Sequence, residues 1–75
     1  MSEPEWVREE LEEISDMLNH ASREVDMARD AAYRRRRDLL SLHLEAAEKL
    51  AKQATSRIGA LAKRLAEKEA APGSR

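Results

Sequence analysis

The spacing of apolar residues constrains this 75-residue chain more than any other feature of its sequence. Intervals of four and three alternate along each half of the chain. Such an alternation keeps side chains on one stripe of an α-helix, as in coiled coils and helical bundles. We call these positions the heptad rows: Val7, Leu11, Ile14, Leu18, Ala21, Val25, Ala28 and Ala32, then Leu40, Leu44, Ala47, Ala51, Ala54, Ile58, Leu61 and Leu65.

The composition predicts an all-α protein. No glycine or proline occurs between Pro4 and Gly59, and the chain is rich in the best helix-forming residues. Cysteine is absent, which excludes disulfides and thiolate metal sites. We expect one all-helical domain over residues 1–71, with a helix at about 4–33, a turn or pivot at 34–38 and a helix at about 39–70. Residues 72–75 are expected to form a disordered tail.

The charges of the two halves differ in sign. Residues 1–33 hold ten acidic and three basic side chains, whereas residues 34–75 hold eleven basic and five acidic ones. A parallel pairing of the halves places acid beside acid, whereas antiparallel packing places acidic residues beside basic ones. The residues brought together are Glu9, Glu10, Glu12, Glu13 and Asp16 in the first half, and Arg57, Lys63 and Arg64 in the second. The charge pattern therefore favours antiparallel packing.

Three arrangements satisfy antiparallel packing, and they differ at the basic stretch Arg34–Arg37. We favour a helical hairpin that turns at residues 34–38 and dimerises into a four-helix bundle. The alternatives are one long helix in an antiparallel dimer, and a compact three-helix bundle with a second break near residues 18–22. Arginine is a good helix former, so local propensity does not choose among them.

A second apolar stripe lies beside the heptad rows and makes the apolar surface wider than a two-helix seam needs. This width suits a bundle of four helices. We expect Trp6 to fill the core or an interface. The stripe comprises Trp6, Met17, Met27 and Ala31 in the first half, and Leu39, Leu42, Ala46 and Leu50 in the second.

The sequence predicts no enzyme, cofactor or metal site. The acidic residues at 9–16 lack the enclosed pocket that separates the pKa values of catalytic carboxylates. Neither His20 nor His43 follows a carboxylate at the Glu-x-x-His spacing of bundle metal sites. No apolar run is long enough to cross a bilayer, and the acidic start is unlike a secretory signal. A soluble cytoplasmic protein that does not bind membranes is expected.

We therefore expect a protein–protein interaction or assembly module that forms a homo-oligomer, most simply a dimer, and binds a larger protein. Arg34, Arg35, Arg36 and Arg37 are the candidate site for an anionic partner. One alternative is a nucleic-acid-associated regulator that uses these arginines. Another is a small inhibitor of the phage or plasmid type that occludes an enzyme. The residues predicted for self-association are Val7, Leu11, Ile14, Leu18, Val25, Leu40, Leu44, Ile58, Leu61 and Leu65.

Overall fold

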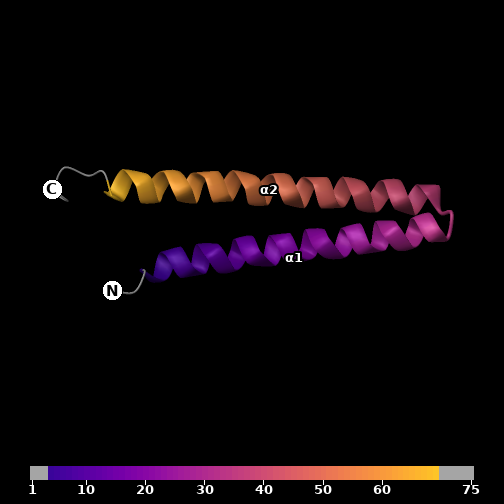
Figure 1. Ribbon diagram of the computed structural model, residues 1–75, viewed down its shortest axis with the longest axis horizontal. Helices are drawn as coiled ribbons and strands as arrows, with labels where there is room; N and C mark the ends of the chain where they lie inside the picture. Colours follow the sequence, from indigo (N-terminus) through magenta and orange to yellow (C-terminus); the bar gives the residue numbers. More distant parts are fainter. Residues whose placement is uncertain (1–3, 70–75) are drawn as a thin grey trace.

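The chain forms an antiparallel helical hairpin (Figure 1). The computed structural model describes residues 4–69, in which α1 spans Glu5–Tyr33 and α2 spans Arg37–Glu69. The predicted all-α hairpin is therefore confirmed. Neither alternative is formed, because the chain reverses between the helices and α1 continues unbroken through residues 18–22. The predicted tail at 72–75 lies outside the described residues.

The turn between the helices is built around Arg35, whose φ of 57° lies in the left-handed region. The Arg36 N–H donates to the Ala31 carbonyl at 2.8 Å, and the Arg35 N–H donates to the Ala32 carbonyl at 3.1 Å. These two bonds form a Schellman motif, which ends a helix by satisfying its last carbonyls. The position that glycine usually occupies in this motif is filled here by an arginine.

The second helix begins directly after this motif. The Arg36 carbonyl accepts the Leu40 N–H at 2.9 Å, so Arg36 stands at the start of α2. The Arg36 guanidinium also hydrogen-bonds the Asp38 carboxylate, at 3.2 and 3.4 Å. This contact, together with the Leu39 backbone N–H, lowers the pKa of Asp38. A carboxylate in the first turn also suits the positive end of the helix dipole.

The core between the helices is narrow and rich in alanine. Among residues 4–69, only three large side chains are buried, namely Val7, Ile14 and Leu61. The other buried residues are Ala21, Ala28, Ala31, Ala47 and Ala54. Small side chains let helices approach closely, but they remove little apolar surface from water.

The seam inside the hairpin differs in part from the predicted heptad rows. Every second heptad position is buried or half-buried, beginning with Val7 and Ile14 in α1 and with Leu40 and Ala47 in α2. The other residues of the seam lie three places after these positions, whereas the heptad rows predicted residues four places after them. The seam therefore takes up Met17, Ala31 and Leu50 from the second stripe, together with polar residues Glu10, Glu24, His43 and Arg57.

Replacing Arg35 with glycine should stabilise the hairpin, since glycine adopts positive φ without the steric penalty of an L side chain. We expect a gain of about 0.5–1 kcal/mol after the greater freedom of glycine in the unfolded chain is subtracted. The free energy of unfolding is measured by urea titration followed by circular dichroism. Arg37→Gly is the control, because it removes the same charge at a helical position and should destabilise the protein. Equal losses for both variants would contradict the turn geometry.

Candidate interaction face

The hairpin is a flat object with two different faces. Its Cα atoms extend 59 × 18 × 12 Å, so it is about one helix thick and each face is open to a neighbour. On one side of the seam, Glu10 meets Arg57 and Glu24 meets His43 across the two helices. We call this side the closed face. The remaining heptad positions lie on the opposite side, which we call the open face.

The open face carries a row of exposed apolar side chains from both helices. Each of these residues follows a buried or half-buried heptad position by four places, so each projects beside the seam. Their exposed fractions lie between 46% and 51%, although they are of the same type as core residues. They are Leu11, Leu18 and Val25 in α1, and Leu44 and Ile58 in α2.

The residues predicted for self-association thus divide into two groups. Val7, Ile14 and Leu61 are buried inside the hairpin, and Leu40 and Leu65 are half-buried. The other five form the exposed row of the open face. The structure brings all ten to the seam or directly beside it.

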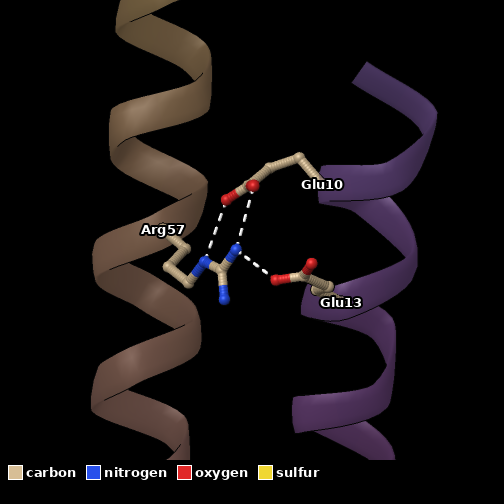
Figure 2. Close-up of polar contacts among 3 residues, drawn as sticks. All are labelled: Glu10, Glu13 and Arg57. Carbon is tan, nitrogen blue, oxygen red and sulfur yellow. Dashed lines mark hydrogen bonds and ion pairs between the residues drawn. The ribbon is translucent and has the colours of Figure 1, made fainter. Parts of the chain in front are cut away.

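The closed face is held by an ion-pair cluster around Arg57 (Figure 2). Arg57 donates from Nε and Nη2 to the two carboxylate oxygens of Glu10, each at 2.9 Å, and from Nη2 to Glu13 at 2.5 Å. A planar guanidinium matches a carboxylate in this two-bond geometry. The hydrogen bonds hold the pKa of Glu10 below its ordinary value of 4.5 and raise the pKa of Arg57. This cluster confirms the predicted pairing of acidic α1 with basic α2.

A second polar contact on the closed face joins His43 to Glu24. His43 Nδ1 lies 2.6 Å from Glu24 Oε1, and His20 Nε2 lies 3.9 Å from Glu24 Oε2. The His20 contact joins residues four places apart on α1, whereas the contact from His43 depends on the register of the two helices. Within residues 4–69, no group of three or more histidine, aspartate or glutamate side chains is arranged to hold a metal ion.

Trp6 covers the end of the closed face where α1 begins and α2 ends, which we call the terminal end. The Arg64 guanidinium lies 4.1 Å from the centroid of the indole ring, and Lys68 lies 5.6 Å from it. Trp6 also packs against the buried cluster of Ile14, Ala54 and Leu61. These contacts agree with its expected role as a core plug.

The four arginines gather at the opposite end of the hairpin, the turn end. Arg34 pairs with Asp30 at 3.3 Å and Arg36 pairs with Asp38 at 3.2 Å. Arg35 and Arg37 form no ion pair with any of residues 4–69. A hollow of about 270 Å³ lies at this end, lined by Ala31, Ala32, Arg35, Arg36, Arg37 and Leu40. Because Ala32 and Leu40 belong to the heptad rows, the hollow adjoins the open face.

Comparison with known proteins adds no family to this description. No protein-family model, curated protein or solved structure matches the chain. Neither α1 nor α2 is long and apolar enough to cross a membrane over the part of the chain that the structure describes.

The Arg57 cluster predicts a loss of stability in acid. Because the pKa of Glu10 is lowered in the folded protein, its stabilising effect is complete above 4.5 and is lost as the pH falls through the folded value. Glu10→Gln should therefore lower the thermal unfolding midpoint at pH 7 and flatten its decline between pH 5 and pH 3. Circular dichroism measures both.

Glu12→Gln is the matched control for that experiment. Glu12 is exposed and forms no ion pair with the described residues, so its neutralisation should leave the pH profile nearly unchanged. Identical profiles for the two variants would show that the Arg57 cluster does not stabilise the hairpin.

Proposed function

We propose that this protein is a non-enzymatic assembly module whose open face binds a second copy to form a four-helix bundle. The observation that carries the proposal is the row of five half-exposed, large apolar side chains on that face. The row continues the same four-three spacing that builds the core. A second helical pair packed on it completes the bundle for which such a wide apolar surface is suited.

The edges of the open face favour a helical partner. Eight residues of the two helices lie next to the exposed row, on the side away from the seam. Five of these eight are serine, threonine or alanine. Small side chains at an edge leave space for a neighbouring helix to approach. A surface that lies on a membrane instead concentrates lysine and arginine at its polar border. The eight residues are Arg8, Ser15, Ser22, Arg29, Ser41, Glu48, Thr55 and Ala62.

The closed face is unsuited to the same role. Its seam is crossed by the ion pairs of Arg57 and the contact between Glu24 and His43, and Trp6 is covered by Arg64. Burying these charges under a second hairpin would remove water from groups that are still partly hydrated, which carries a large desolvation penalty. Self-association through the open face avoids this penalty.

Binding of an anionic partner at the turn end is a second candidate function. It is favoured by the two arginines, Arg35 and Arg37, that have no acidic partner among residues 4–69, and by the hollow beside them. Guanidinium groups suit carboxylate and phosphate ligands alike. An acidic protein surface fits better than a long nucleic-acid duplex, because the acidic α1 limits the basic surface to this one end.

A charge placed in the exposed row should abolish self-association. Leu18 is 46% exposed in the hairpin, so Leu18→Glu should leave the hairpin folded but put two carboxylates into the buried interface of the dimer. Loss of about 1 kcal/mol of apolar burial per copy, before the charge is counted, raises the dimer dissociation constant about thirtyfold. Analytical ultracentrifugation measures that constant.

Asn19→Glu is the matched control, since it adds the same charge one residue away at an exposed position outside the heptad rows. Its dimer dissociation constant should equal that of the unaltered protein. A monomer for the unaltered protein at hundreds of micromolar, or equal effects of both substitutions, would overturn the proposal.

A further inference from the structure

We infer that the second copy docks with its turn at the opposite end, so that each turn end lies over the terminal end of its partner. This inference rests on the proposed self-association and adds the orientation and the contacts. Two copies related by a two-fold axis can place their open faces together in two ways. Either the two turns lie at the same end of the bundle, or they lie at opposite ends.

The sizes of the open-face side chains differ between the two ends of the hairpin. At the terminal end the open face presents Leu11, Ile58 and Leu65, whereas at the turn end it presents Ala32 and Leu44. With both turns at one end, the large side chains of the two copies would meet at the terminal end, and the two Ala32 side chains would leave space at the turn end. Interiors are close-packed, so such an uneven interface would lose contacts at its thin end.

Opposite orientation removes this mismatch along α1. The constant rise of a helix places residue i of one α1 level with residue 39 − i of the other when the two run antiparallel about the midpoint of the heptad row from Val7 to Ala32. The exposed Leu11 side chain then lies between Val25 and Ala32 of the partner's open face, and the exposed Leu18 side chain lies between the partner's Leu18 and Val25. The large end of one α1 row thus meets the small end of the other.

The same arrangement fills the hollow at the turn end. That hollow has a volume of about 270 Å³, and its lining combines three apolar residues, Ala31, Ala32 and Leu40, with Arg35, Arg36 and Arg37. Helical side chains tilt toward the N-terminus of their own helix. The Leu11 side chain of the second copy therefore points toward this hollow when its α1 runs antiparallel. Leu11 is 50% exposed in the single hairpin, so it is available for this contact.

The charges at the two ends favour the same orientation. Residues 34–38 hold four arginines and one aspartate, a balance of +3. At the terminal end, residues 5–13 hold five acidic and one basic side chain. Residues 57–68, which include the Arg57 that pairs with Glu10 and Glu13, hold four basic and one acidic, so the combined balance is −1. Turns at the same end would bring two +3 regions together. Turns at opposite ends bring Arg35 and Arg37 toward the acidic start of the partner's α1.

A distance between spin labels on the two copies tests the orientation. The chain has no cysteine, so Tyr33→Cys gives a single labelling site beside the turn, at a residue that is 83% exposed. With the turns at opposite ends, the two labels are separated by about 27 residues of helix, or about 40 Å. With the turns at the same end, they lie about 10–20 Å apart across the bundle. Pulsed dipolar spectroscopy distinguishes these values.

Asn19→Cys supplies the control, because residue 19 lies near the middle of α1 and its two labels are about 10–20 Å apart in either orientation. We expect a long distance at position 33 and a short one at position 19. Short distances at both positions would overturn the inferred orientation while leaving the self-association intact. Absence of dipolar coupling at both positions, with a monomeric mass by ultracentrifugation, would overturn the self-association and the inference with it.

Discussion

The packing of α1 on α2 through a single narrow column of side chains is the constraint on which the rest of the molecule depends. Two helices can bury only the residues that lie directly between them, and five of the eight residues buried within the described part of the chain are alanine. The apolar surface of each helix is wider than that column. The excess therefore remains exposed: five large apolar side chains form the row from Leu11 to Ile58 on the open face, and Met27 and Leu42 are exposed outside that row.

The ion pairs decide which side of the hairpin carries this row. The positions on the other side of the seam include Glu10, Glu24, His43 and Arg57, and they pair with one another inside the hairpin. Their contacts fix the register of the two helices, because the two-bond geometry between Arg57 and Glu10 tolerates little displacement. The two faces of the hairpin therefore differ: charged contacts cross the seam on the closed face, and the row of exposed apolar side chains lies on the open face.

Much of this architecture could be predicted from the sequence, and two parts could not. The helices and the antiparallel pairing followed from the heptad spacing and the opposite charges of the two halves. The turn was ambiguous because Arg35 adopts a left-handed conformation that glycine usually marks, and no glycine is present there. Arginine has a high helix propensity, so a continuous helix through residue 35 satisfied the local rules equally well.

The seam was misassigned for a related physical reason. The residue three places after a buried position and the residue four places after it can each lie beside it in the core. After Val7 these residues are Glu10 and Leu11, and the apolar character of Leu11 favoured it in the sequence-based prediction. The structure buries Glu10 in part because Arg57 on α2 neutralises it, which is a property of the pair and not of either segment. The width of the apolar surface, to which Met17 and Leu50 belong, was the available signal that the apolar residues form both a buried seam and an exposed row beside it.

Coupling between folding and association is the central claim, and the concentration dependence of thermal unfolding tests it most directly. A narrow hairpin that gains stability by covering its open face with a second copy should have a midpoint that rises with protein concentration. For a dimer, a hundredfold increase in protein concentration adds about 1.4 kcal/mol per chain to the free energy of unfolding. Between 2 and 200 µM we therefore expect the midpoint, measured by circular dichroism, to rise by about 5–10 °C. A midpoint that stays constant across this range would contradict the account, because it would show that no second copy stabilises the hairpin by covering its open face.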